Sequence, residues 1–295
     1  MPVYDINGNP LQTVYGLNGS ALSHAYDIDG TEIFPDEPPT PPTPTAFKTM
    51  SYNVGSWTNF GNKATASNQD FWYGVQNAIF TAEDADLCGI QEYYSAIYSY
   101  SVPTMLYQYF TSLYAVDRQS GPTKAGRCLC SNFGLSNTSE VNFVHQNGEV
   151  RSYLIGDVTI NGKTVKFLTA HLALDYATII EQIQELLSAV ANFDYWILTG
   201  DFNIAFPDAQ SDGYTYLVKP FLDAGYHVAN GSTFGFIPTF STKAPGDDSD
   251  WRVIDNIMCS ANIDITNVYV DDTKLDMLTT QGIDHLPLIA EMELL

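Results

Sequence analysis

The chain has 295 residues, of which 45% are hydrophobic and 16% are charged, and its formal net charge is -22 at pH 7. The apolar content excludes a wholly disordered chain, because it offsets the entropy lost on folding, and the length suits one large domain or two modest ones. The charge argues against a protein that holds nucleic acid through a broad basic surface, but not against a hydrolase that contacts phosphates transiently through a bound cation.

Residues 1–34 contain a short repeat. Residues 3–8 read Val-Tyr-Asp-Ile-Asn-Gly, and residues 25–30 read Ala-Tyr-Asp-Ile-Asp-Gly. Asn-Gly and Asp-Gly are strong signals of type I′ hairpin turns, so we expect a small N-terminal β-hairpin appendage here. Calcium binding at Asp27 and Asp29 is an alternative that lacks the other ligands of a calcium loop.

A proline-rich segment follows at residues 35–45. Proline favours extended polyproline II and is excluded from helix and sheet interiors, so we predict a linker. Residues 46–295 then form the main domain. The appendage and linker are typical of an attachment module, which leaves open that they dock onto a larger assembly.

From residue 46 onward, strand-like and helix-like segments mix without the strict alternation of a parallel α/β sheet. Two amphipathic patterns predict helices over residues 69–82 and 176–191. The turn Asn161-Gly162 between two apolar runs predicts a hairpin. The fold class is therefore α+β, with helices covering stacked sheets. The expected strands cover residues 47–54, 87–92, 127–133, 151–160, 164–171, 195–200, 253–260, 263–270 and 286–294.

The four cysteines all lie in apolar, strand-like segments, and none has the Cys-x-x-Cys spacing of a zinc site. We expect buried free thiols at Cys88, Cys128, Cys130 and Cys259. Neither a basic-plus-apolar leader nor an apolar run of about 20 residues is visible, so we expect no membrane span. The compartment is left open.

Polar side chains with catalytic potential lie at or near the ends of several expected strands: most follow a strand, Asp255 lies inside residues 253–258, and Asp284 and His285 immediately precede the last strand. They are Asn53, Gln91, Glu92, His171, Asp201, Asn203, Asp255, Asp284 and His285. Strand ends that meet at one edge would bring these groups together. Carboxylate and amide oxygens suit Mg²⁺, Mn²⁺ or Ca²⁺, and histidines donate to phosphate oxygens or transfer protons near neutral pH. This set suits hydrolysis of a phosphodiester.

Six short motifs resemble, in order, those of the endonuclease/exonuclease/phosphatase superfamily, which includes deoxyribonuclease I. The resemblance covers roughly residues 46–295. The motifs are Met50-Ser51-Tyr52-Asn53-Val54, Gly89-Ile90-Gln91-Glu92, Thr169-Ala170-His171-Leu172, Gly200-Asp201-Phe202-Asn203, Val253-Ile254-Asp255-Asn256-Ile257 and Asp284-His285-Leu286-Pro287.

The resemblance implies a four-layer α/β/β/α sandwich, in which two mixed β-sheets pack face to face and helices flank them. It also implies a metal-bearing cleft at one edge of the sandwich, with Mg²⁺ as the expected ion and Mn²⁺ or Ca²⁺ as alternatives. By position, the implied metal ligands are Asn53, Glu92 and Asp284, and the implied catalytic residues are His171, Asp201, Asn203, Asp255, His285 and Arg127.

The resemblance also implies a role for each catalytic residue. Asp201 and Asn203 match the pair that orients the attacking water and contacts the phosphate. His285 matches the histidine that pairs with a carboxylate, here Asp255, and either accepts the proton of the water or braces the phosphate. His171 matches a second histidine that acts as an acid or phosphate donor. Arg127 is similar to an arginine that contacts the phosphate in deoxyribonuclease I.

Two positions depart from the family pattern. Ile283 stands where a serine is common before the aspartate, and Asn256 stands where an aromatic residue often follows Asp255. Neither change removes a ligand or a proton carrier. They alter the surroundings of Asp255 and Asp284 and leave the subfamily open.

The expected function is a divalent-metal-dependent phosphodiester hydrolase, an endonuclease that engages DNA or RNA transiently and directs water at phosphorus. The acidic composition keeps a second reading open, a phosphoesterase for a lipid head group or small-molecule phosphate, similar to sphingomyelinases or inositol phosphatases. A noncatalytic binding protein on the same fold is the third reading, motivated by the N-terminal repeat.

Overall fold

The computed structural model describes residues 46–55, 67–97, 99–117, 126–148, 150–241, 251–273 and 284–295. All elements named below belong to one compact unit, Thr45–Leu295. The predicted appendage (1–34), the linker (35–45), the calcium alternative and Ile283 lie outside the described residues, so the docking role of the N-terminal segment stays a prediction.

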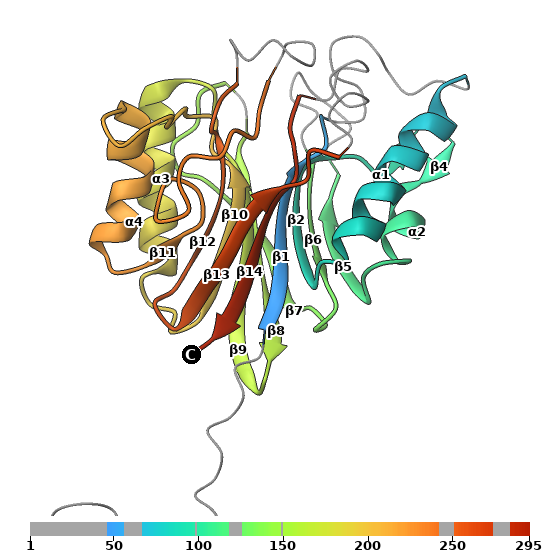
Figure 1. Cartoon of the computed structure of the whole chain (residues 1–295), viewed down its shortest axis with the longest axis horizontal. Coiled ribbons are helices and arrows are strands. Elements are labelled where there is room, and N and C mark those ends of the chain that lie inside the picture. Colours follow the sequence, from blue (N-terminus) through green and yellow to red (C-terminus); the bar gives the residue numbers. More distant parts are fainter. Residues whose placement is uncertain are drawn as a thin grey trace, which may run out of the picture. The chain divides into compact units, whose positions relative to one another are not determined.

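The first sheet has six strands in the order β13-β14-β1-β2-β6-β5 (Figure 1). β1 and β2 run parallel, and the other neighbours are antiparallel. In sheet order, the strands are Ile263–Val270, Leu288–Leu294, Ala46–Asn53, Leu87–Tyr93, Gly126–Ser131 and Ser112–Val116.

The second sheet also has six strands, in the order β11-β12-β10-β9-β8-β7. β9 and β10 run parallel, and their neighbours are antiparallel. In sheet order, the strands are His227–Val228, Asp255–Cys259, Trp196–Asp201, Lys163–His171, Ser152–Ile160 and Ser136–Asn142. Two short strands, β3 (Ala96–Ile97) and β4 (Tyr100–Ser101), form a separate hairpin.

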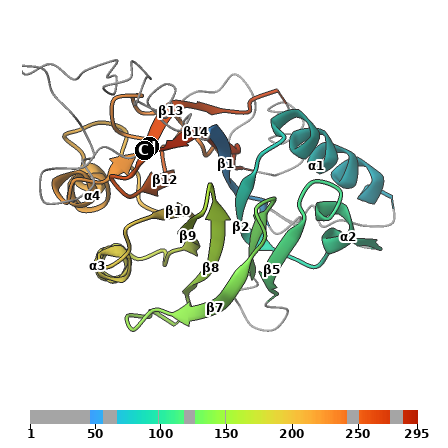
Figure 2. The ribbon, with the colours of Figure 1, turned by 90° about the horizontal axis from the view of Figure 1, so that it is seen from below.

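Residues alternate between the two faces of each strand, and this alternation separates three apolar clusters. The inner faces of the two sheets meet through a cluster that includes Leu129, Phe167 and Ile257. Outside the first sheet, α1 (Gln69–Glu83) and α2 (Val102–Leu106) pack on residues such as Met50. Figure 2 shows the sheets between the two helical layers.

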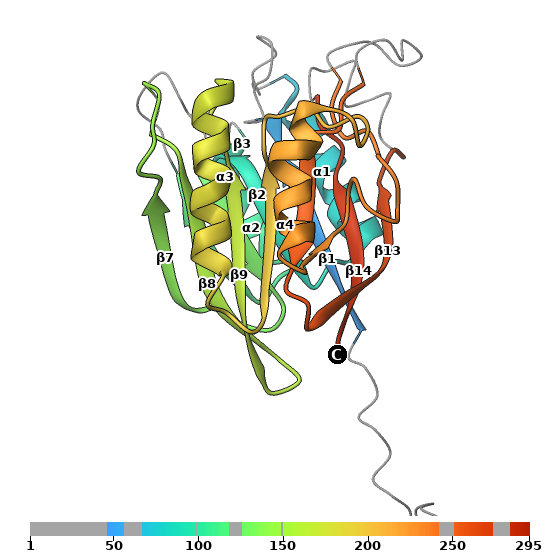
Figure 3. The ribbon, with the colours of Figure 1, turned by 90° about the vertical axis from the view of Figure 1, so that its left-hand side faces the viewer.

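The outer face of the second sheet carries α3 (Tyr176–Val190), a π-helical turn (Tyr214–Val218) and α4 (Lys219–Asp223). α3 and α4 lie alongside each other on this face (Figure 3) and bury apolar side chains against strand residues such as Leu198. The four layers of the predicted α/β/β/α sandwich are therefore confirmed.

All nine expected strands and both expected helices are present, with corrected ends. The strand expected at 127–133 spans Gly126–Ser131, and those expected at 253–260 and 286–294 begin at Asp255 and Leu288. The last two differ for a structural reason. The residues just before each strand pair instead with Phe240, through isolated bridges to Arg252 and His285. The strands β5 and β7 and the short helices α2 and α4 were not predicted.

The four cysteines are buried and free, as predicted. Within the described parts of the chain, every helix is too short or too polar to cross a membrane.

Candidate active site

Strand ends from both sheets meet at one end of the sandwich. In the first sheet, Asn53 lies beside Gln91 in the parallel pair β1/β2. In the second, Asp201 lies between His171 on β9 and Asp255 on β12. This end is opposite the β8–β9 hairpin, which lies at the bottom of Figure 1. The predicted convergence of strand ends is therefore present.

Each of these side chains lies on the face of its strand that points toward the other sheet. Phe167, Ile197 and Ile257 face the other sheet, so the period of two places His171, Asp201 and Asp255 on the same inner face. The strands thus carry apolar residues in the middle of the sandwich and polar ones at its end. Burial of the polar groups follows from this placement, because both sheets shield them.

Asn53 and Asp201 join the two sheets directly. The Nδ2 group of Asn53 donates to Oδ2 of Asp201 at 2.9 Å and lies 3.5 Å from Oε1 of Glu92. Its Oδ1 atom accepts from the backbone N–H of Gly55 at 2.9 Å. Asn53 therefore holds a predicted metal ligand, Glu92, and a predicted catalytic carboxylate, Asp201, near each other.

Glu92 and Asn203 have unusual backbone conformations, with φ values of 55° and 53°. Glu92 lies at an irregularity of the β2/β6 pairing between Gln91 and Tyr93, where the register shifts. A bulge of this kind redirects the side chain. Asn203 donates from Nδ2 to the Leu172 carbonyl at 3.0 Å. Non-glycine residues in the left-handed region cost energy and are concentrated at functional sites.

Two histidines face the same carboxylate oxygen. Nε2 of His171 lies 3.5 Å from Oδ2 of Asp201, and Nε2 of His285 lies 3.6 Å from that atom. On the other side of the His285 ring, Nδ1 lies 2.9 Å from Oδ2 of Asp255. Asp255 therefore fixes the His285 ring with Nε2 directed at the site. The predicted His285–Asp255 pair is present.

Burial and charge shift the three titrating groups in different directions. Burial, reinforced by the Asp255 charge, raises the pKa of Asp201 to about 7, although His285 and Asn53 oppose the shift. Burial lowers the pKa of His285, but the carboxylates of Asp255 and Asp201 outweigh it and raise this pKa to about 10. For His171, burial and the nearby Arg151 and Arg127 charges hold the pKa well below its usual value. We infer a cationic His285 and a neutral His171 near pH 7.

Asp284 approaches the site from the first sheet. The β1/β14 register ends at Ser51 opposite Leu288, so the residues just before Leu288 lie alongside the end of β1. The backbone carbonyl of Asp284 accepts from Ser241 at 2.8 Å. Burial raises the pKa of Tyr52, the neighbour of Asn53 in the chain. The charges of Asp271, Cys88 and Asp284 raise it further. Asp284 thus lies at the same end of the sandwich as Asn53.

Arg127 is fully buried on the inner face of β6. Its Nη2 group donates to the hydroxyl of Ser152 and lies 3.4 Å from Oε1 of Glu140. The charges of Arg127 and Arg151 both reach His171. Direct contact between Arg127 and a phosphate stays a prediction.

Gln91, one of the predicted polar groups, belongs to a polar layer beneath the site whose contacts across the sheets were not predicted. Nε2 of Gln91 donates to the Thr169 hydroxyl in the opposite sheet at 2.9 Å. A Cβ atom built on Gly89 would lie 1.8 Å from Oγ1 of Thr199, so only glycine permits this approach of the two sheets. The alternation of residues along β2, β9 and β10 was the sequence pattern that could have indicated these inward-facing polar contacts.

Asn256, a departure from the family pattern, is buried and pairs with Asn230. Its Nδ2 group donates to the Asn230 carbonyl at 2.7 Å, and its Oδ1 atom accepts from the Asn230 N–H at 2.9 Å. An aromatic side chain makes neither bond. Asn230 could not be predicted as its partner, because 26 residues separate the two.

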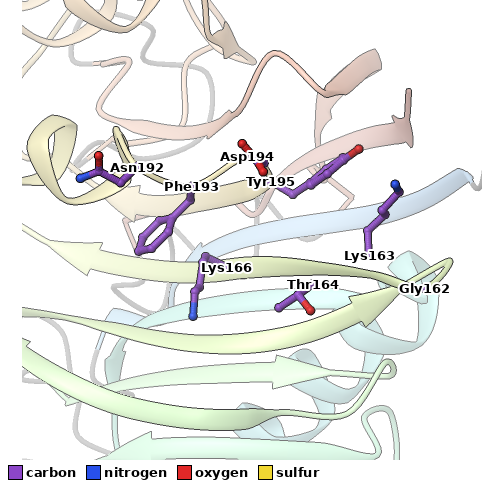
Figure 4. Close-up of a pocket in the computed structure, with 8 residues that line it drawn as sticks. All are labelled: Gly162, Lys163, Thr164, Lys166, Asn192, Phe193, Asp194 and Tyr195. Atoms are coloured by element: carbon purple, nitrogen blue, oxygen red, sulfur yellow. The ribbon is translucent and has the colours of Figure 1, made fainter.

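The pocket in Figure 4 lies away from this site. It is lined by Lys163 and Lys166 at the start of β9, where Lys166 is bound to Asp157 at 2.5 Å and Lys163 lies over the Tyr195 ring. His171 is at the other end of that strand, about 26 Å away at roughly 3.3 Å per residue. The pocket plays no part in the predicted chemistry.

Comparison with known proteins supports the fold. No family model matches the chain, and no curated protein matches its sequence. A Bacteroides vulgatus endonuclease/exonuclease/phosphatase structure matches with a TM-score of 0.63 and 14% identity, over 85% of this chain and 100% of that one. A humanized D. rerio TDP2 matches with a TM-score of 0.61 and 16% identity, over 84% and 98%.

A further D. rerio TDP2 structure, complexed with a single strand DNA product, matches with a TM-score of 0.58 and 16% identity, over 84% of this chain and 99% of that one. At these identities the likeness concerns the fold. The chain has the fold of the endonuclease/exonuclease/phosphatase proteins, and the resemblance inferred from its six motifs is confirmed at that level.

Proposed function

We propose that the protein is a divalent-metal-dependent phosphodiesterase that cleaves nucleic acid. The observation that carries the proposal is the buried cluster around Oδ2 of Asp201, which Asn53, His171 and His285 approach within 2.9, 3.5 and 3.6 Å. A structural role alone does not explain two histidines and a second carboxylate around one buried carboxylate, because burying such charges is costly.

The residues at this end fit a hard cation. Glu92 and Asp284 offer carboxylate oxygens, and Asn53 offers the second lone pair of Oδ1, whose first accepts from the Gly55 N–H. Mg²⁺, Mn²⁺ and Ca²⁺ prefer such oxygens, and we propose that these three residues hold the ion. Among the described residues, a different group, Asp201, Asp255 and His285, has potential ligand atoms that all lie within 4.8 Å of one another. Because His285 bonds Asp255 there, we assign that group to proton transfer. When bound, a divalent cation stabilises the charge that develops on phosphate oxygens.

Residues of the chain itself carry out proton transfer and hold the phosphate. Asp201, with a pKa raised by burial to about 7, accepts the proton of the attacking water near neutral pH. The cationic His285, held by Asp255, donates from Nε2 to the phosphate and transfers a proton to the leaving oxygen as its bond to phosphorus breaks, which balances the proton taken up by Asp201. His171 stays neutral and donates a hydrogen bond to the phosphate, while Asn203 orients the water or the phosphate through its amide.

A nucleic acid substrate is supported by the fold, which is shared with a TDP2 bound to a single strand DNA product. The net charge of -22 favours the second candidate, a phosphorylated lipid head group or a small phosphoester, because extended phosphate backbones are repelled by an acidic surface. A single scissile phosphate held by a cation and His285 meets less repulsion than a long duplex. We therefore favour short or single-stranded substrates over long duplexes.

The test measures hydrolysis of single-stranded DNA, plasmid DNA, RNA, sphingomyelin and inositol phosphates by the purified protein, with and without a chelator. We expect chelator-sensitive cleavage of the nucleic acids. His285→Ala, purified identically, controls for contaminating nucleases, and Asp157→Asn at the far end of β8 is the matched active control. Cleavage of lipid or inositol phosphates alone would support the second candidate. A folded, metal-replete protein inactive on every substrate would leave the noncatalytic binding protein.

A further inference from the structure

The two halves of the His285–Asp255 pair come from different sheets. Asp255 begins β12 of the second sheet, and His285 precedes β14 of the first. Their 2.9 Å contact therefore depends on the relative position of two layers that pack about 10 Å apart. The backbone segments that carry Asp255 and His285 must therefore keep a fixed relative position.

Residues 239–241 connect these two segments. Phe240 forms bridges to both Arg252 and His285. On one side, the Thr239 N–H donates to the Arg252 carbonyl at 2.9 Å, and the Arg252 N–H donates to the Phe240 carbonyl at 2.8 Å. On the other side, the Leu286 N–H donates to the Thr239 carbonyl at 2.7 Å. This segment thus acts as a short strand between the chain that carries Asp255 and the chain that carries His285.

Thr239 is the residue whose polar groups reach both sides. It is fully buried, and its hydroxyl oxygen lies 3.2 Å from the Asp255 N–H nitrogen and 3.5 Å from that of Ile254. Its carbonyl holds Leu286, the residue after His285. The hydroxyl therefore fixes the backbone of Asp255 relative to the backbone next to His285.

Asn230 anchors the other end of the same segment. Its Nδ2 group donates to the Ile237 carbonyl at 2.8 Å, and its Oδ1 atom accepts from the Ile237 N–H at 2.8 Å. Through its own backbone it is bonded to the Asn256 side chain on β12, next to Asp255. The chain from Asn230 to Ser241 is thus fastened to β12 before it reaches His285.

We propose that residues 230–241 form a clamp that positions the His285–Asp255 pair, with Thr239 as the positioning residue that joins the two sheets. The predicted effect of the clamp on kcat rests on the proposed phosphodiesterase function. Its effect on the His285–Asp255 contact does not. Thr239 touches no reacting group. It acts through Asp255 and His285, so its loss lowers turnover and leaves substrate binding in place.

The test compares Thr239→Val, which keeps the shape and removes the hydroxyl, with Thr239→Ser, which keeps the hydroxyl. We expect Thr239→Val to lower kcat about 10²-fold with KM nearly unchanged, since small misplacements of catalytic groups cost about that much. Thr239→Ser should retain most of the wild-type kcat. Thr266→Val is the matched control, because it removes one threonine hydroxyl bond, to the Glu291 carbonyl on β14, far from the clamp.

A second readout needs no activity. In the full-length protein, the ring proton of His285 shared with Asp255 should give a downfield NMR signal that Thr239→Val broadens or removes and that Thr239→Ser and Thr266→Val retain. Asn256→Ala, which releases the Asn230 anchor, should weaken the same signal and lower kcat less than Thr239→Val does, and it serves in place of Thr239→Val if that variant does not fold.

The proposal is wrong if Thr239→Val keeps both the wild-type kcat and the His285 signal. It is also wrong if Thr239→Ser lowers kcat and weakens the signal as much as Thr239→Val does. It is also wrong if Asn256→Ala leaves both readouts unchanged. A wild-type protein that hydrolyses nothing yet shows the signal and its loss in Thr239→Val would reject the proposed function and retain the clamp.

Discussion

The two ends of the β-sandwich differ in how deeply charged groups are buried and in where residues with positive φ values occur. At the β8–β9 end, Asn161 and Gly162 have positive φ values of 48° and 74° within a two-residue hairpin turn that requires them. At the site end, Glu92 and Asn203 have similar φ values outside any such turn, beside buried charges. At the hairpin end the positive φ values are those that the turn requires, whereas at the site end the same strain occurs beside buried charges, a combination typical of functional sites.

The charged groups differ in the same way. Near the hairpin, Asp157 is buried but is bound by Lys166 and by Nδ2 of Asn137. Burial alone would raise its pKa, but these contacts lower it. At the site, Asp201 is fully buried next to Asp255, and burial raises its pKa to about 7. A carboxylate thus stabilises the fold at one end and destabilises it at the other. Substitutions at the two ends should therefore have opposite effects.

The largest expected effect comes from Asp201→Asn. It should lower kcat/KM by about 10³-fold, within the range for loss of a proton acceptor. Thermal unfolding at pH 8 should shift to higher temperature, because the variant removes the cost of burying a carboxylate whose pKa is raised to about 7. This gain should exceed the loss of one hydrogen bond, from Asn53 or from the Asn203 N–H, that the amide cannot accept. Steady-state kinetics and calorimetry measure the two changes.

Asp157→Asn is the matched control for Asp201→Asn. It should lower the unfolding temperature, because it removes the ion pair with Lys166, and it should leave kcat/KM unchanged. If Asp201→Asn instead destabilised the protein as Asp157→Asn does, the contrast between the two ends would be lost.

A second prediction concerns the metal. Mg²⁺ at 100 times its Kd should stabilise the wild-type protein by about 2.7 kcal/mol, because a ligand that binds only the folded state adds to its stability. Glu92→Gln should abolish this shift and lower activity, because it removes a charged ligand. Thermal unfolding with a chelator and with added Mg²⁺ measures the effect. A metal-dependent shift of the same size in Glu92→Gln would place the ion elsewhere.

Much of the fold could be predicted, because its central strands and long helices carry strong periodic patterns. β10 is buried throughout, β9 is buried from Phe167 onward, and α3 carries Ile179, Ile183 and Leu186 on one face. The edge strand β7 reads Ser-Asn-Thr-Ser-Glu-Val-Asn, which has no apolar alternation. Its place in the sheet depends on backbone hydrogen bonds to β8, and these leave no pattern in the sequence.

The site divides in the same way. Asn53, His171 and Asp201 could be placed together because each ends a predicted strand. The contacts made across the sheets could not, because Thr239 lies in an irregular segment and Asn230 is 26 residues from Asn256. Their partners are set by how the layers stack, which no local pattern encodes.

A third prediction uses the strained asparagines, one at each end. Asn203→Gly relieves the positive φ but removes the amide that bonds the Leu172 carbonyl, so kcat should fall about 10²-fold, as for loss of one active-site donor. Asn161→Gly relieves the same strain in the hairpin and should change neither kcat nor KM. Its unfolding free energy should change by no more than about 1 kcal/mol. Equal activities for the two variants would remove Asn203 from the site.

The smallest expected effect lies on the surface, at the contact between His145 and Glu185 of α3. The imidazole Nδ1 lies 2.7 Å from Oε1 of Glu185, and this hydrogen bond raises the pKa of His145. Partial burial raises the pKa of Glu185, but the N–H groups of Val144 and His145 and the imidazole together lower it. The pair is therefore fully charged over a wider pH range in the folded state than in the unfolded state.

The raised His145 pKa gives stability that is complete below about pH 6.5 and is lost as the pH rises. The lowered Glu185 pKa gives stability that is present above about pH 4.3 and is lost as the pH falls. The contribution should therefore peak between these limits. His145→Gln should lower the unfolding temperature slightly at about pH 5.5, less at about pH 8, and in neither case change kcat. An equal loss at both pH values would mean that packing, and not charge, holds this loop to α3, because only the charged contact depends on protonation of the imidazole.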